Sequence, residues 1–237
     1  MKLKLIFFPI LIILFSCSTD KEINSDFVIY PVNSKSDRIE FFWKDNHKQP
    51  FRSLQNLEKY INSGNKDLIF AMNGGMFIQH NIPKGLYVEN FKTLNPINTL
   101  AGKGNFYLKP NGIFYVTKSN ESAIVSTENF KANPKIKFAT QSGPMLIIDG
   151  KINPAFQNHS RNLNIRNGVG ILKNGSPVFV MSKKEINLYS LASLFKSLEC
   201  ENALYLDGFV SRTYFPKGNW IQKDGDFGVI IGIIKEK

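Results

Sequence analysis

The stretch LIFAMNGGMF, residues 68–77, is an apolar run that ends in one polar residue and a pair of glycines. Five consecutive apolar residues bounded by a turn signal are typical of a strand buried in a sheet. Asn73 comes directly after this strand, and Gly74 and Gly75 allow a sharp turn or a close approach of the backbone to a ligand. A plain tight loop explains the glycines equally well. Whether this strand end belongs to a functional site therefore depends on which residues lie at the other strand ends.

Polar and small residues meet beside apolar strands at three further places in the chain. The segments are QSGP at 141–144, RNGVG at 166–170 and LDG at 206–208, the last followed by Ser211 and Arg212. Each is a weak signal by itself, because Gly-Pro and Asn-Gly pairs are ordinary turns. Arginine is scarce, yet Arg161, Arg166 and Arg212 lie in or near these segments. Its planar fork suits phosphate or carboxylate, so these strand ends form the candidate site.

The chain from residue 26 onward contains many short apolar runs and no linker, charge block or repeat that would divide it. Runs typical of strands lie at residues 27–30, 38–43, 68–72, 105–108, 113–116, 145–148, 169–172, 178–181, 204–206 and 228–234. Tight turns are predicted at 110–112, 149–150 and 174–175, where Asn-Gly or Asp-Gly supplies the positive φ that a hairpin needs.

Two segments have the apolar spacing of helices. Ser53 is placed to cap a helix through Tyr60, and Asn187 to cap a longer one. The apolar stripes that we interpret as core are Leu54, Leu57 and Ile61 in the first helix, and Leu188, Leu191, Leu194, Phe195 and Leu198 in the second. Two helices among many hairpins predict an α+β fold. We expect a single β-rich domain over residues 26–237, with a mixed, largely antiparallel sheet and two main helices.

Composition excludes several classes of protein. The chain has 237 residues, of which 43% are hydrophobic and 21% charged, so it is not disordered or fibrous as a whole. Its 2 Cys and 3 His lack metal-ligand spacing, and no nucleotide-binding glycine motif is present. We therefore expect no metal and no cofactor. The net charge of +11 has two readings: a biased Lys-rich composition, or attraction to phosphates, acidic polysaccharide or a phospholipid surface.

The N-terminus is typical of an exported protein. Lys2 and Lys4 precede an apolar run over residues 5–15, which is too short to span a bilayer but suits a signal peptide. The run leads into LFSC at 14–17, which looks like a bacterial lipobox with Cys17 as the lipidated residue. An ordinary signal peptide with an incidental Cys is the rival interpretation. We predict a signal peptide over residues 1–16 and a tether over residues 17–25.

This prediction has consequences for location and partners. The protein is expected in the bacterial cell envelope, held to a membrane through lipidated Cys17, in the outer membrane or at the periplasmic face if the cell is Gram-negative. Export removes cytoplasmic nucleic acid as a partner. Cys200 then has no thiol to pair with, and we interpret it as a buried small hydrophobic residue.

In order along the chain, the motifs resemble those of the phosphodiester glycosidase family. They are NGGMF at 73–77, KGLYV at 84–88, GNF at 104–106, QSGPML at 141–146, RNGVG at 166–170 and ALYLDG at 203–208. The resemblance extends from about residue 68 to the C-terminus and is closest to the short bacterial branch. The animal member continues after LDG with a Gly-rich run, whereas this chain has the bulkier FVSR at 209–212.

The resemblance implies hydrolysis of a sugar-1-phosphodiester at the bond between the anomeric carbon and a phosphate oxygen, with an N-acetylglucosamine-like sugar. Asp207 would be the carboxylate at the anomeric centre, and Arg166, together with Arg212, the cationic clamp on the phosphate. The implied substrate-binding residues are Asn73, Gly74, Gly75, Ser142, Gly143, Ser211 and Arg212. Two alternatives stay open: Arg166 and Asp207 form a purely structural salt bridge, or the protein is a non-catalytic envelope lipoprotein that binds phosphorylated or acidic glycan.

Overall fold

The computed structural model describes residues 26–237. The predicted signal peptide, Cys17 and the tether lie outside these residues. In the described part of the chain, no helix is both long and apolar enough to cross a membrane.

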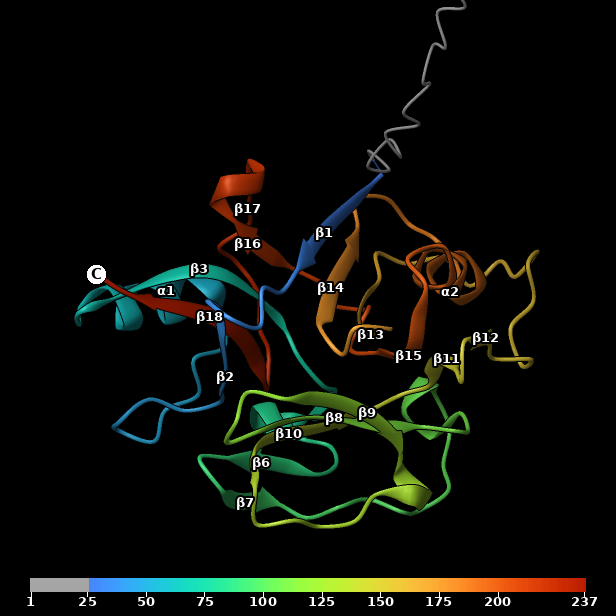
Figure 1. The fold of residues 1–237 in the computed structure, drawn as a ribbon, viewed down its shortest axis with the longest axis horizontal. Helices are drawn as coiled ribbons and strands as arrows, with labels where there is room; N and C mark the ends of the chain where they lie inside the picture. The colour runs from blue at the N-terminus through green and yellow to red at the C-terminus, as the bar shows by residue number, and fades with distance from the viewer. Residues whose placement is uncertain (1–25) are drawn as a thin grey trace, which may run out of the picture.

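Three antiparallel sheets build the molecule (Figure 1). The first has the order β1-β14-β13-β15-β11-β12, with β1 (Phe27–Pro31), β11 (Met145–Ile148), β12 (Lys151–Ile152), β13 (Asn167–Leu172), β14 (Pro177–Ser182) and β15 (Cys200–Tyr205). The second has the order β7-β6-β10-β8-β9, with β6 (Tyr87–Glu89), β7 (Lys92–Asn95), β8 (Gly112–Thr117), β9 (Ser122–Ser126) and β10 (Ile136–Ser142).

The third sheet contains the apolar strand that ends at Asn73. Its order is β17-β16-β3-β18-β2, with β2 (Arg38–Phe42), β3 (Lys66–Asn73), β16 (Thr213–Phe215), β17 (Trp220–Ile221) and β18 (Ile230–Glu236). A small hairpin of β4 (Phe77–Ile78) and β5 (Ile82–Pro83) follows β3. The α+β prediction is confirmed, although the strands form three sheets and every pairing within residues 26–237 is antiparallel.

One aromatic core joins the three sheets. Phe70 of β3 stacks on Tyr30 of β1, with ring centroids 4.4 Å apart, and on Phe179 of β14 at 5.5 Å. Phe114 of β8 contacts Phe179 at 5.9 Å and Phe41 of β2 at 5.7 Å. These rings are buried, and their contacts run from sheet to sheet without a break. The relative positions of the strand ends are therefore set by a packed core.

Both predicted helices are confirmed with their caps. In α1 (Leu54–Asn62) the Ser53 hydroxyl accepts the Asn56 N–H, and the predicted apolar stripe is buried. In α2 (Leu188–Ser197) the Asn187 side chain accepts the Ser190 N–H at 2.8 Å. Figure 1 shows α1 beside β3 and α2 beside β15, so the helices cover different sheets.

One predicted strand and its turn are wrong. Residues 105–108 do not form a strand, because a 3-10 turn, η2 (Asn105–Tyr107), begins after Gly104 at a φ of 90°. Phe106 is buried by this turn, and its carbonyl accepts the Asn111 side-chain N–H at 3.0 Å. The segment at 110–112 therefore leads into β8 and joins no hairpin. The turns at 149–150 and 174–175 do form hairpins, with Gly150 and Gly175 at positive φ.

Strand β10 is missing from the sequence prediction although it is central in its sheet. Its last three residues, Thr140, Gln141 and Ser142, are polar but fully buried. The Gln141 side chain accepts the N–H groups of Leu86 and Asn98, each at 2.9 Å. Because tertiary contacts satisfy these polar groups, their burial leaves no apolar pattern in the sequence.

Candidate active site

Asp207 lies where three strand ends meet. It follows β15, and its backbone N–H donates to the Asn167 side chain, at the start of β13, over 3.0 Å. Its carbonyl accepts the Asn73 side-chain N–H, at the end of β3, over 2.8 Å and the Ser211 hydroxyl over 3.1 Å. The structure thus brings together three of the four segments that the sequence singled out.

The fourth segment joins the same cluster through Ser142. This hydroxyl is buried and donates to the carbonyl of Leu206, next to Asp207. Gly143 follows Ser142, and its backbone packs closely on Asn111. A Cβ on Gly143 would lie only 2.5 Å from the Asn111 Cβ. All four predicted strand ends therefore hold the loop after β15.

Asn73 acts as the central link of this cluster. Its side-chain oxygen accepts the Asn167 amide N–H and the Arg212 backbone N–H, each at 3.0 Å. Beside it, Gly74 donates its N–H to the Val229 carbonyl at 2.8 Å, and a Cβ on Gly75 would lie 2.3 Å from the Thr140 hydroxyl. These contacts position the backbone around Asp207. A direct contact of these residues with substrate stays a prediction.

The Asp207 carboxyl is half-buried, and its environment favours the neutral form. Burial raises its pKa from 3.8 to about 6, while the Phe209 N–H and the positive charge of Lys84 act in the opposite direction. The Phe209 N–H lies 3.4 Å from the carboxylate oxygen, so it is a weak donor. A carboxyl with a pKa this close to neutrality, at the end of a loop held by many hydrogen bonds, is typical of an acid–base group or nucleophile.

Lys84 is a further candidate residue, which was not among the predicted site residues. Its ammonium lies over the rings of Phe106 and Tyr107, 5.2 and 4.6 Å from the centroids. Its backbone is held by an N–H bond to the Met76 carbonyl at 2.9 Å. The charge lowers the pKa of Asp207, so the two groups attract each other. The motif at 84–88 marked the place, but nothing distinguishes this lysine from the many others in the sequence.

Arg166 is fully buried, and its guanidinium is held by neutral acceptors. Nε donates to the Ile186 carbonyl at 2.7 Å, one terminal nitrogen to the Tyr205 hydroxyl at 3.0 Å, and the other to the Asn162 carbonyl at 2.7 Å. Within residues 26–237 no carboxylate pairs with it. The structural salt bridge between Arg166 and Asp207 is therefore excluded as an interpretation.

Tyr205 connects Arg166 to the loop of Asp207. Its hydroxyl accepts the Arg166 N–H and lies so near Gly208 that a Cβ there would be 1.9 Å from the oxygen. Burial raises the pKa of Tyr205, the Arg166 charge lowers it, and the Asp207 charge raises it. The hydroxyl thus stays neutral and contacts both the Arg166 guanidinium and Gly208, the residue after Asp207.

A cavity of about 250 Å³ adjoins this group, and Arg166 forms part of its wall. Polar side chains of Asn105, Gln157, Ser160 and Asn162 line it together with apolar residues, including Phe156 and Leu188. The turn η2 contributes Asn105 to the cavity and the two rings that hold Lys84. The turn η2 therefore links the wall of the cavity to the surroundings of Lys84.

Arg212 and Ser211 occupy the far side of the Asp207 loop. The Arg212 guanidinium forms an ion pair with Asp224 at 2.8 Å, and Ser211 donates to the Ile165 and Asp207 carbonyls. Arg212 thus faces Asp224 rather than Arg166. No group of three or more His, Cys, Asp or Glu residues is arranged to hold a metal ion in the described residues.

Comparison with known proteins places the chain in a family. The family model of phosphodiester glycosidases matches residues 66–230. The uncharacterized protein YigE of Escherichia coli K12 is 39% identical over 190 residues, which cover 80% of this chain and 74% of that protein. The chain belongs to the phosphodiester glycosidase family. The resemblance seen in the sequence motifs is confirmed, and the matched residues include every candidate site residue.

Solved structures show the same family fold. The zebrafish catalytic domain of N-acetylglucosamine-1-phosphodiester α-N-acetylglucosaminidase, auto-inhibited by its pro-peptide, matches with a TM-score of 0.60 and 14% identity, over 88% of this chain and 82% of that one. A putative exported protein of Burkholderia pseudomallei matches with a TM-score of 0.59 and 10% identity, over 87% and 73% of the two chains. At these identities the likeness concerns the fold of this phosphodiester glycosidase family member, not its substrate.

Proposed function

We propose that the protein is a hydrolase that cleaves the glycosidic bond of a sugar-1-phosphodiester and releases free sugar and a phosphate monoester. The observation that carries this proposal is the Asp207 carboxyl, with its pKa near 6, beside Lys84 at the strand ends that the family motifs occupy. An N-acetylglucosamine-like sugar is the first candidate, because the zebrafish structural relative is named for that substrate.

The charged side chains at the candidate site suit cleavage of this bond. Ionised Asp207 takes a proton from a water molecule that attacks the anomeric carbon, or attacks that carbon itself and forms a glycosyl ester that water then hydrolyses to free sugar. The bond from that carbon to the phosphate oxygen breaks, and its electron pair leaves with the phosphate. Since a phosphate monoester is a good leaving group, the strong general acid of ordinary glycosidases is less necessary. Lys84 opposes the charge that grows on the leaving phosphate, and Arg166 holds Tyr205 and the loop in place.

A product analysis tests the proposal. The full chain, purified in detergent, is mixed with a chromogenic phosphodiester of α-N-acetylglucosamine-1-phosphate, and free sugar and phosphate monoester are followed together. We expect both to appear at equal rates. Sugar-1-phosphate would instead show cleavage on the other side of phosphorus and overturn the proposal. Binding without turnover across a panel of sugar phosphates would favour the non-catalytic, glycan-binding alternative.

The pH profile links Asp207 to Lys84. Because Asp207 must be ionised to act, kcat/KM of the unmodified protein should fall about tenfold per pH unit below about pH 6. In Lys84→Met, loss of the positive charge should raise the pKa of Asp207, so the fall in kcat/KM at acidic pH should begin at higher pH. The maximal kcat/KM should also decrease about 10- to 100-fold. Lys92→Met, at an exposed lysine of β7, is the matched control and should change neither. An activity that instead falls above pH 6 would assign Asp207 the role of general acid.

We also propose that the protein is an envelope lipoprotein anchored through Cys17, as its N-terminal sequence indicates. Cells that express the full chain should incorporate labelled palmitate into it, and Cys17→Ser should abolish the labelling. Cys200→Ser is the control and should keep the label, because that thiol is buried in the fold. Equal labelling of wild type and Cys17→Ser would refute the anchor.

A further inference from the structure

A basic surface region lies away from Asp207, where the second and third sheets meet. A hollow of about 280 Å³ there is lined by four cations, Lys35, Arg38, Lys118 and Lys137, and by one carboxylate, Glu40. A second hollow of about 480 Å³ shares Arg38 and Glu40 with the first and adds Lys66, Lys235 and Glu236. We call the two hollows together the basic groove. None of its residues lines the Arg166 cavity.

Most cations of the groove have no acidic partner. Lys66 pairs with Glu236 at 3.7 Å, but within residues 26–237 the other five form no ion pair. Nearby Glu121 accepts the Ser119 hydroxyl at 2.9 Å, and Glu40 is the one carboxylate in the first hollow. The groove therefore carries excess positive charge in a concave surface, where field lines concentrate and anions are attracted.

The walls of the first hollow are fixed by hydrogen bonds. The Asn120 side chain, in the β8–β9 turn, donates to the carbonyls of Ser34 and Asp37, at 3.2 and 3.0 Å. Asp37 in turn accepts the Tyr30 hydroxyl at 2.9 Å, and Tyr30 belongs to the aromatic core. The loop that carries Lys35 is thus tied to the hairpin that carries Lys118, so the cations face one preformed hollow.

The shape of the basic groove and the residues that line it favour one class of anionic partner over others. None of the large exposed hydrophobic side chains in the described residues lines the groove, so it lacks the apolar contacts that membrane-surface binding adds to charge. It also lacks the aromatic rings on which nucleic acid bases stack. The lining does contain Ser34, Thr117, Ser119 and Asn120, whose donors are engaged within the protein but whose oxygen atoms can accept hydrogen bonds from sugar hydroxyls. Two hollows on either side of Arg38 exceed the size of a single phosphate.

We propose that the basic groove binds an anionic polysaccharide chain, with successive negative groups in the two hollows on either side of Arg38. This binding is separate from hydrolysis at Asp207. Binding of this polymer explains part of the net positive charge of the chain, which biased composition alone would otherwise explain.

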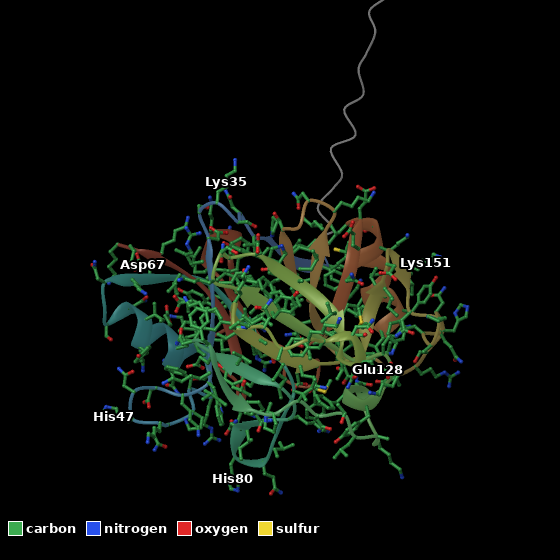
Figure 2. The ribbon with its side chains drawn as sticks, turned by 60° about the horizontal axis from the view of Figure 1, so that its bottom comes forward. Lys35, His47, Asp67, His80, Glu128 and Lys151 are labelled. Atoms are coloured by element: carbon green, nitrogen blue, oxygen red, sulfur yellow. The ribbon has the colours of Figure 1, made fainter. Side chains whose placement is uncertain are left out.

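Binding of the full chain in detergent to polygalacturonate tests the proposal, with uncharged dextran as one comparison ligand. Phosphatidylglycerol vesicles are the other and are added after the detergent has been removed, because detergent would dissolve them. The groove variant carries Lys35→Gln, Arg38→Gln, Lys118→Gln and Lys137→Gln. The control variant removes the same charge at four exposed lysines elsewhere: Lys92→Gln, Lys131→Gln, Lys151→Gln and Lys217→Gln. Figure 2 shows that Lys35 and Lys151 project from separate parts of the surface. Melting temperatures confirm that each variant is folded.

We expect the wild type to bind polygalacturonate at low salt and not to bind dextran. The groove variant should lose affinity at least about tenfold, the control variant no more than about threefold, and added salt should weaken wild-type binding steeply. Equal losses in both variants would show that net charge alone is responsible and overturn the proposal. Absence of wild-type binding, or groove-dependent binding to the vesicles in preference to the polysaccharide, would also overturn it. Because the assay needs no turnover, its failure is distinguishable from failure of the proposed hydrolase.

Discussion

The Asp207→Asn variant is expected to lose turnover of a sugar-1-phosphodiester by at least about 10³-fold while keeping its fold. Asn has almost the same shape as Asp but has neither a negative charge for the anomeric carbon nor a basic oxygen for water. The backbone N–H and carbonyl of residue 207, which hold the loop, are unaffected by the change. Rates of sugar release by wild type and variant at saturating and limiting substrate measure the loss.

The same substitution should stabilise the folded protein. Burial raises the pKa of Asp207 from 3.8 to about 6, so the folded state binds the proton more tightly than the unfolded chain. Stability from this group is therefore complete below about pH 4 and is lost as the pH rises through 6. Asn carries no such cost, so the variant should exceed the wild type by about 1–3 kcal/mol in unfolding free energy at pH 7. The difference should disappear near pH 4.

Asp149→Asn is the matched control, because Asp149 also precedes a glycine but lies exposed in the β11–β12 turn. Turnover should stay at the wild-type value, since Asn tolerates the positive φ of 47° at that position. If Asp207→Asn kept its activity, the carboxylate would have no place in the mechanism. A decrease in stability at pH 7 would contradict the desolvation of the half-buried Asp207 carboxyl.

The sequence allowed the strand ends of the site to be predicted, but not all of its chemistry. Asn73, Asn167 and Asp207 lie at the ends of apolar strands, and such strands were recognisable because the residues nearest the site are buried on both faces of the sheet. Their meeting point depends on the pairing of β13 with β15 and on the contact of β3 with the loop after β15. Strand pairing is a long-range property that no local pattern encodes, so these pairings were not predicted.

Lys84 and Arg166 show why the charges were harder to assign. Arg166 was predicted as a clamp because its residue type suits phosphate, yet the protein itself occupies its fork with the Asn162 and Ile186 carbonyls and the Tyr205 hydroxyl. The Lys84 ammonium packs on two rings of η2, a segment predicted to be a strand, and its charge lowers the pKa of Asp207. The wrong prediction for this segment therefore left no local pattern that singled out Lys84.

Arg166→Met should destabilise the protein by about 3–5 kcal/mol, measured by urea unfolding followed by circular dichroism. Two effects compete in this substitution. Removing a buried cation that has no carboxylate partner in the described residues is favourable by itself. Against it, the Ile186 carbonyl and the Tyr205 hydroxyl lose charge-assisted donors, each worth about 1.5–3 kcal/mol. Water entering the adjoining cavity can replace the bonds to Asn162, which limits the total.

Arg161→Met is the control, because Arg161 is exposed five residues earlier in the same loop, and its effect should stay within about 0.5 kcal/mol.

Arg166→Lys distinguishes two roles for Arg166: binding the phosphate through its charge, and positioning the Asp207 loop. If the charge itself binds the phosphate, the lysine variant should recover KM even though its stability remains low. If Arg166 acts by holding Tyr205 and thereby the Asp207 loop, both variants should lose kcat with KM nearly unchanged, since lysine cannot reproduce the fork of three neighbouring bonds. The geometry favours the second result, because the Tyr205 hydroxyl stands between the guanidinium and the loop. Unchanged stability of Arg166→Met would show that these bonds do not hold the site together.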